Sequence, residues 1–431
     1  MNGSHAKADK TTVFKACVSL NGPVLSGYNV VAAKDISRDE RVVSCPFSLA
    51  ITPQVARRGI SAVLALETSS PALTQWSERQ LICTYLSLHR ALDTARSPPE
   101  LMHGPYVSIL PAPHKLCTPL HFTGAELALF RGTNLYGATL DRQRAWEAEW
   151  EDCRDVLEAH NSDVADRFTW AEYLTASTYL SSRAFPSTLL SENPSLVSTP
   201  SSYPVLLPGV DNLNHARAQP VSWVVTHPSS STSYTHVPAP PLTPTISLVL
   251  HTSTAAGNEL FNNYGPKPNA ELILGYGFAL PHNPDDTIVL KIGSANADDA
   301  GIESKWEVGR QARGVEPVWE AVKAAVRAQN QYEAGADADG AEGTDVANPY
   351  EEELWATEVL ADMAEDLMSR LPSNSQRRDA SVRPEVLQML DYYIEGQRDI
   401  LNSLMNFAKE MEQNVIQQAQ ERGIAIVDDS S

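Results

Sequence analysis

Cysteines are few in this sequence of 431 residues, and their spacing suits neither metal binding nor disulfide bonding. There are five, an odd number, and no C-x-x-C pair occurs among them. Structural zinc sites use closely spaced cysteine pairs, and disulfide frameworks use an even number of cysteines. We therefore expect no metal site, no disulfides and a reducing compartment. The five are Cys17, Cys45, Cys83, Cys117 and Cys153.

Long apolar runs and an excess of positive charge are absent as well. No run approaches the roughly 18 apolar residues of a membrane-spanning helix, and residues 1–10 lack the apolar region of a signal peptide. We expect a monomeric protein of the cytoplasm, the nucleus or both, without membrane attachment. The formal net charge of −20 argues against nucleic-acid binding, which needs clustered Lys and Arg. An acidic surface suits a basic or lysine-bearing protein substrate, although the same charge serves solubility equally well.

What the sequence does contain is a change of pattern along the chain, within a globular composition of 42% hydrophobic and 20% charged residues. Short strands and turns are indicated for residues 13–52, and helices from about 55 to 190. We predict an α+β protein whose first domain, residues 13–280, is a β-rich core of small sheets with this inserted helical subdomain. Proline, serine and threonine mark residues 227–245 as an exposed loop.

Helix signals alone follow residue 300, so an all-α second domain is predicted for residues 300–431. Prolines suited to a first helical turn precede three apolar patterns there, namely Pro317, Pro349 and Pro384. In the first domain, S/T-x-x-E/Q capping boxes begin helices at Ser77, Thr123 and Thr169. Between the first two boxes, residues 104–111 are bracketed by prolines and are predicted to be extended.

Two polar motifs beside apolar runs carry the functional interpretation. The first is PGVDNLNH at residues 208–215, and the second is GNELFNNYG at residues 257–265, followed by Tyr276-Gly277-Phe278. With SRAF at 182–185 and SGYNVVAAKDI at 26–36, they resemble the SET-domain methyltransferases of the Rubisco large-subunit lysine methyltransferase branch. The resemblance covers nearly the whole chain and implies a SET core with a helical insert, followed by a helical substrate-binding domain. No cysteine-rich segment follows Phe278, so the zinc-binding segment of many histone methyltransferases is not expected.

The resemblance implies S-adenosylmethionine as the cofactor and Tyr264 as the catalytic residue, whose hydroxyl would orient the target amine. The residues that it places around the cofactor are Ser26, Gly27, Tyr28, Asn29, Arg183, Asn214, His215 and Tyr264. Those that it places around the substrate are Arg183, Phe185, Asp211 and Tyr276. The chain departs from the family pattern at Ser26, which is usually Glu, and at Asn29, which is usually Gly.

The implied activity is lysine N-methylation of a non-histone protein, with a ribosomal or translation protein as the expected substrate. A lysine must lose its proton before it attacks, at a cost of about 4.6 kcal/mol at pH 7, and a dry aromatic channel lowers that cost. Two alternatives stay open. One is a histidine methyltransferase of the same fold, a branch that carries Asn where this chain has Phe185. The other is a SET-like binding scaffold that has lost catalysis, an idea motivated by the changes at Ser26 and Asn29.

Overall fold

Most of the chain is described by the computed structural model, which divides it into two units. The described residues are 13–14, 18–24, 27–92, 97–227, 243–292, 304–336, 349–373 and 381–424. The first unit comprises Met1–His121, Asp141–Pro266 and Gly275–Gly277, and the second comprises Phe122–Leu140, Lys267–Leu274 and Phe278–Ser431. Most of the exposed loop predicted at 227–245 lies outside the described residues. None of the described helices has the length and apolar character needed to cross a bilayer.

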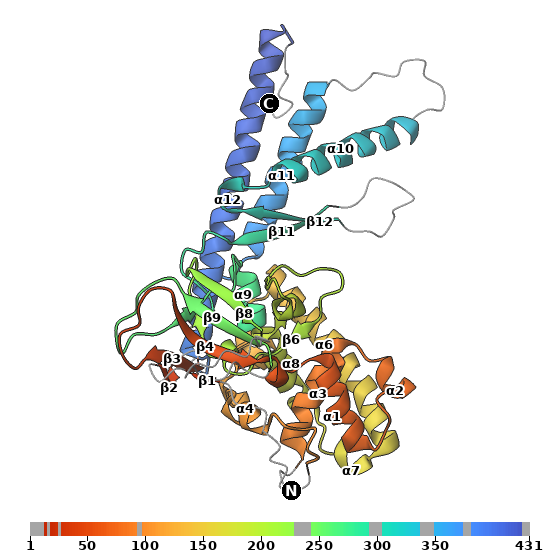
Figure 1. Cartoon of the computed structure of the whole chain (residues 1–431). Helices are drawn as coiled ribbons and strands as arrows, with labels where there is room; N and C mark the ends of the chain where they lie inside the picture. The colour runs from red at the N-terminus through yellow and green to blue at the C-terminus, as the bar shows by residue number, and fades with distance from the viewer. Residues whose placement is uncertain are drawn as a thin grey trace, which may run out of the picture. The chain divides into compact units, whose positions relative to one another are not determined.

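Small sheets form the β part of the first unit (Figure 1). The largest has the order β1-β4-β9-β8, with β1 (Val13–Phe14), β4 (Glu40–Pro46), β9 (Thr245–Leu250) and β8 (Val221–Thr226). Two-stranded sheets join β2 (Val18–Val24) to β3 (Gly27–Ala32), β5 (Phe185–Pro186) to β6 (Pro204–Val205), and β7 (Asn214–His215) to β10 (Phe261–Asn262). The central strand β9 is almost wholly buried, which explains its continuous apolar sequence.

Helices that lie between β4 and β5 in sequence supply the larger apolar core of the first unit. They are α1 (Pro53–Leu64), α2 (Pro71–Thr74), α3 (Glu78–Ala91), α4 (Gly104–Ile109), α7 (Ser162–Ala165), α8 (Trp170–Arg183) and most of α6 (Asn134–His160). Apolar side chains of α1, α3 and α8 pack together, as Figure 1 shows for the helices themselves. The capping box at Ser77 is complete. At Thr169 the hydroxyl accepts the Glu172 amide, while the Glu172 carboxylate pairs with Arg90.

The segment 104–111 differs from its prediction. The sequence predicts an extended chain between its prolines, and this is wrong, because Gly104–Ile109 form the helix α4. Pro105 occupies the first turn, where a proline costs no intrahelical hydrogen bond. A helix this short contains too few residues to display a periodic pattern. Its fold matters for the site, since Tyr106 is buried.

The second unit is built mainly of long helices. α10 (Glu316–Ala336), α11 (Pro349–Arg370) and α12 (Pro384–Glu421) share an apolar core, and α11 runs alongside α12 (Figure 1). Each begins at or next to one of the three predicted prolines. The unit also contains α5 (Gly124–Ala128), which begins with the complete capping box predicted at Thr123, and the first residues of α9 (Asn269–Tyr276).

Strands also occur in the second unit, so the prediction of helices alone after residue 300 is wrong for β12 (Ser304–Gly309). This strand pairs antiparallel with β11 (Thr287–Ile292) over six residues. In it, exposed Lys305 and Glu307 alternate with half-buried Trp306 and buried Val308. Such an alternation over four residues is too short to stand out in the sequence. Among the described residues, the 3-10 helices are η1 (Phe47–Leu49), η3 (Pro113–Lys115), η4 (Pro119–His121), η5 (Ser187–Leu190), η6 (Val210–Asn212) and η8 (Arg310–Ala312).

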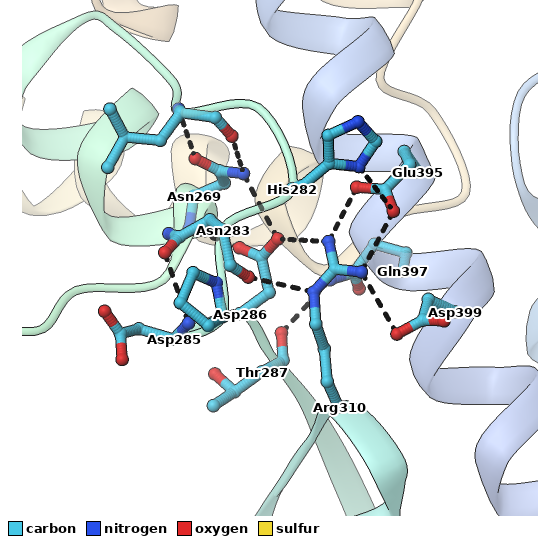
Figure 2. A network of polar contacts seen from close by, with 12 residues as sticks. Asn269, His282, Asn283, Asp285, Asp286, Thr287, Arg310, Glu395, Gln397 and Asp399 are labelled. Carbon is cyan, nitrogen blue, oxygen red and sulfur yellow. Dashed lines mark hydrogen bonds and ion pairs between the residues drawn. The ribbon is translucent and has the colours of Figure 1, made fainter.

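A network of charged side chains connects these elements within the second unit (Figure 2). The guanidinium of Arg310 donates to Asp286 (3.3 Å), Glu395 (2.6 Å) and Asp399 (3.0 Å). The other oxygen of Asp286 accepts the backbone N–H of Asn269 at the start of α9, at 2.7 Å. Burial raises the pKa of Asp286 to about 6, although the bonds from Asn269 and Arg310 oppose the rise. One arginine thus serves three carboxylates.

Candidate functional site

The segment that follows Gly209 carries three of the predicted site residues, Asp211, Asn214 and His215. Gly209 has a φ of 86°, a left-handed value that favours glycine. The chain then forms η6 (Val210–Asn212) and continues into β7 (Asn214–His215). In β7, Asn214 and His215 lie opposite Phe261 and Asn262 of β10 in a parallel pair. The two motifs, distant in sequence, are therefore neighbours in space.

Tyr264 is held by this turn at both its backbone and its hydroxyl. Its N–H donates to Nδ1 of His215 at 3.0 Å, and its hydroxyl donates to the carbonyl oxygen of Leu213 at 2.9 Å. The Tyr264 ring stacks on His215, with ring centres 5.0 Å apart, and on Tyr276, with ring centres 5.1 Å apart. Burial raises the pKa of Tyr264, although Arg183 opposes the rise, so the phenol keeps its proton at neutral pH.

Tyr276 is placed by the glycine that follows it. Gly277 has a φ of 79°, and a Cβ built there would lie 2.8 Å from the backbone carbon of Cys117. Only glycine therefore suits both the turn and the close approach of the two backbones. This explains the glycine of the Tyr276-Gly277-Phe278 motif. The residue before this turn, Tyr276, is the one whose ring stacks on Tyr264.

Arg183 and Asp211 form a buried ion pair, to which Tyr106 of α4 contributes. Nη1 of Arg183 donates to the Asp211 carbonyl oxygen at 3.0 Å and lies 3.5 Å from its carboxylate. The carboxylate also accepts the Tyr106 hydroxyl at 2.5 Å and the Gly209 N–H at 3.1 Å. The Asp211 side chain is 0% exposed. Burial raises its pKa, and Arg183 and Tyr106 oppose that rise.

The polar side chains beside β7 and β3 form the other part of the site. Nδ2 of Asn214 donates to Glu259 at 2.7 Å. Glu259 in turn lies opposite Val31 of β3 in an antiparallel bridge. Two residues before Val31, the buried side-chain oxygen of Asn29 has no hydrogen-bond partner among the described residues. Since buried polar atoms are normally satisfied, the Asn29 oxygen requires a donor from outside the described residues, and a bound ligand could supply it.

Other predicted residues take different places. Phe185 lies in β5, where its ring packs edge-on against Trp223 with ring centres 5.2 Å apart. Gly27 and Tyr28 form part of β3, whose next residue is Asn29. Ser26 lies outside the described residues.

Two residues of the site escaped the sequence analysis. Tyr106 belongs to a segment predicted to be extended, and nothing in its local pattern indicates a partner 105 residues away. Glu259 lies inside the second motif, between Asn258 and Leu260. An acidic side chain within that motif could have been predicted as a site residue.

Two ribosomal lysine methyltransferases are similar to this chain in sequence. It is 34% identical over 266 residues to Ribosomal lysine N-methyltransferase set10 of Schizosaccharomyces pombe, which covers 62% of this chain and 42% of that protein. It is 27% identical over 221 residues to Ribosomal lysine N-methyltransferase 1 of Saccharomyces cerevisiae, which covers 44% of this chain and 34% of that protein. The match therefore spans less than half the length of either relative. A comparison with models of known protein families gives no match.

The fold has a counterpart among solved structures. The SET domain of LSMT, solved with lysine and AdoHcy, superposes with a TM-score of 0.67 and covers 96% of this chain and 93% of that one. The sequence identity of this pair is 16%. The likeness therefore concerns the arrangement of the elements. The predicted fold class is confirmed by it.

Proposed function

We propose that this chain is a protein-lysine N-methyltransferase. Its fold is that of the SET-domain methyltransferases of the Rubisco large-subunit branch, which its motifs predict. It would transfer a methyl group from S-adenosylmethionine to a lysine of a ribosomal protein. The names of its two relatives support the reaction and the substrate class. The lysine and AdoHcy bound by the structural counterpart support a lysine substrate and a cofactor of this class. A ribosomal substrate would be met in the cytoplasm or the nucleus.

The environment of Tyr264 is the observation on which this proposal depends most. Because the buried phenol keeps its proton and donates it to Leu213, its oxygen can accept an N–H of the target amine and so orient the amine's lone pair. The stacked faces of Tyr264, Tyr276 and His215 form an aromatic wall. Such a wall removes water from a lysine ammonium, which lowers its pKa and favours the neutral, nucleophilic amine. The chain's part in the reaction is then mainly positioning.

The residues around β7 and β3 fit the proposed cofactor. When bound, S-adenosylmethionine supplies an electrophilic methyl group on a sulfonium, and it carries an ammonium and an adenine amine that need acceptors. The side-chain oxygen of Asn29, buried and unpartnered among the described residues, and the carboxylate of Glu259 are such acceptors. Asn214 and His215 would hold the cofactor on the same strand, as predicted. The departure at Asn29 from the family's glycine is thus compatible with binding.

Lysine rather than histidine is favoured as the target. Phe185 packs on Trp223 and has no polar group that could bind an imidazole. The net charge of −20 suits the basic segments that ribosomal proteins present to a partner.

The test is methyl transfer to ribosomal proteins. Purified protein would be incubated with methyl-labelled S-adenosylmethionine and ribosomal subunits, and labelled bands would be hydrolysed to identify the modified amino acid. Labelled methyl-lysine that disappears with Tyr264→Phe would support the proposal. Methyl-histidine would move the activity to the other branch. Failure of the protein to bind the cofactor in calorimetry would favour the inactive scaffold.

A further inference from the structure

The carboxylate of Asp211 is the point where the helical insert meets the turn that holds Tyr264. It accepts hydrogen bonds from Tyr106 and Gly209 and pairs with Arg183. Two residues further along the turn, the carbonyl of Leu213 receives the hydroxyl of Tyr264. The position of the phenol oxygen therefore depends on how firmly Asp211 is fixed.

Tyr106 is well placed to fix it, because its own position is determined by the core of the first unit. Its ring is buried among the apolar side chains of the helical insert. The residue that precedes α4, His103, is bonded on both sides of its ring, by the hydroxyl of Tyr85 at Nδ1 (2.6 Å) and to the carbonyl of Leu49 at Nε2 (3.1 Å). The start of α4 is thus clamped to α3 and η1.

We infer that Tyr106 is a positioning residue for the proposed methyl transfer. Its hydroxyl hydrogen, held on Oδ2 of Asp211, fixes the turn Val210–Leu213 and through it the hydroxyl of Tyr264. Removing that hydrogen bond leaves the carboxylate with Arg183 and backbone N–H groups, including that of Gly209, as its partners among the described residues. The turn can then relax, and the phenol of Tyr264 loses its fixed orientation. This inference rests on the proposed function for its kinetic consequences, but the effect on Tyr264 does not.

The helical insert contains a matched control in Tyr173. Its hydroxyl donates to Oε2 of Glu149 at 3.0 Å, and Glu149 pairs with Arg79 at 2.8 Å. Tyr106 and Tyr173 are both buried tyrosines that donate to a carboxylate paired with an arginine. Only the carboxylate of Asp211 belongs to the turn that contacts Tyr264.

The experiment compares Tyr106→Phe with Tyr173→Phe. Both keep the ring and remove one phenol–carboxylate hydrogen bond. Both should lower the melting temperature, and Tyr106→Phe should lower it more because Asp211 is wholly buried. We expect kcat to fall about 10- to 100-fold in Tyr106→Phe, the range of a hydrogen bond to a charged group, with little change in KM for the cofactor. The acid limb of the kcat profile should move to higher pH, because Asp211 loses a donor that opposes the rise in its pKa. Tyr173→Phe should change neither quantity.

A second measurement needs no catalysis. The protein would be labelled with ¹³C at tyrosine Cζ, and the Tyr264 resonance would be assigned by its absence in Tyr264→Phe. The inference requires that this resonance shift in Tyr106→Phe and stay unchanged in Tyr173→Phe. An unchanged resonance, or a kcat that falls equally in both variants, would overturn it. If the wild type transfers no methyl group, the proposed function fails, while the resonance still decides the role of Tyr106.

Discussion

Two clusters in the first unit contain the same three chemical groups and differ in what they hold. In one, Tyr106 and Arg183 surround Asp211, and in the other, Tyr173 and Arg79 surround Glu149. Each is a phenol, a carboxylate and a guanidinium in contact. A pair of clusters with such similar chemistry allows their roles to be compared directly.

The difference lies in the backbone that carries the carboxylate and in its access to water. Glu149 lies within the long helix α6, whose own hydrogen bonds fix it, and its side chain is 25% exposed. Asp211 lies in a single turn, and its side chain is 0% exposed. Because no water can replace a lost donor at Asp211, its partners determine the shape of the turn. The comparison predicts that such an ion pair matters more for function in a short turn, which has only a few backbone hydrogen bonds, than in a long helix.

Replacing the carboxylates by amides should separate the two clusters most strongly. Asp211→Asn leaves Arg183 without a buried counter-charge and sets an amide N–H₂ against donors, which costs about 3–5 kcal/mol of unfolding free energy. The same change should lower kcat at least about 100-fold, more than a single hydrogen bond is worth. Glu149→Gln should cost about 1 kcal/mol and leave kcat unchanged, since water can reach its site. Denaturant unfolding and steady-state kinetics measure both. Equal losses in the two variants would contradict the distinction.

Protonation of His103 at low pH should weaken the contacts that hold the start of α4, the helix that carries Tyr106. Burial lowers the pKa of His103 to about 4, although its bond to Leu49 opposes the shift. A histidine with a lowered pKa contributes stability that is complete above about pH 6.5 and is lost as the pH falls towards 4, by about 3 kcal/mol. As the pH falls over this range, the wild type should therefore lose stability that His103→Gln does not lose. Melting temperatures at pH 7, 6, 5 and 4 test this, with Tyr173→Phe as the control whose difference stays constant.

The sequence could predict the residues that lie within one motif, and it failed where contacts join distant segments. Tyr264, His215 and Asn214 were predicted as site residues because two motifs contain them, and the structure brings the two motifs together through the β7–β10 pair. Tyr106 was missed, since its bond to Asp211 spans 105 residues and its helix has only six. Long helices with prolines or capping boxes at their start were predicted correctly, because those signals are local.

The short strand β12 was missed for a related reason. A strand is identified by alternation and by its pairing partner. The partner of β12 is β11, and the residues that connect the two strands, 293–303, lie outside the described part of the chain. No single-sequence pattern indicates which two segments pair. The contacts of Arg310 depend on tertiary structure in the same way, because its three carboxylate partners come from two segments that are distant in sequence.

Arg310 sharpens the comparison, because it is an arginine with three carboxylates rather than one. Among these, Asp286 has a pKa raised by burial to about 6. An acid with a raised pKa disfavours the folded state increasingly as the pH rises from about 4 to 6, here by about 3 kcal/mol. The difference between Asp286→Asn and the wild type should therefore move in favour of the variant as the pH rises, the opposite of His103→Gln. A difference that does not change between pH 4 and 7 would show that Arg310 keeps the carboxylate ionised throughout.

Asn29→Gly should have the smallest effect, and it tests the other side of the site. Gly is the residue that the family pattern has at this position, so the change restores the pattern while it removes the unpartnered oxygen. If that oxygen accepts a hydrogen bond from the bound cofactor, the variant should bind S-adenosylmethionine about fivefold more weakly, the equivalent of about 1 kcal/mol. Calorimetry measures the affinity, and Tyr173→Phe provides a control with unchanged binding. Tighter binding by Asn29→Gly would instead indicate that the asparagine is an obstacle that this chain tolerates. In that case the turn that contains Asp211, and not Asn29 of β3, would be the part of the site that is organised for function.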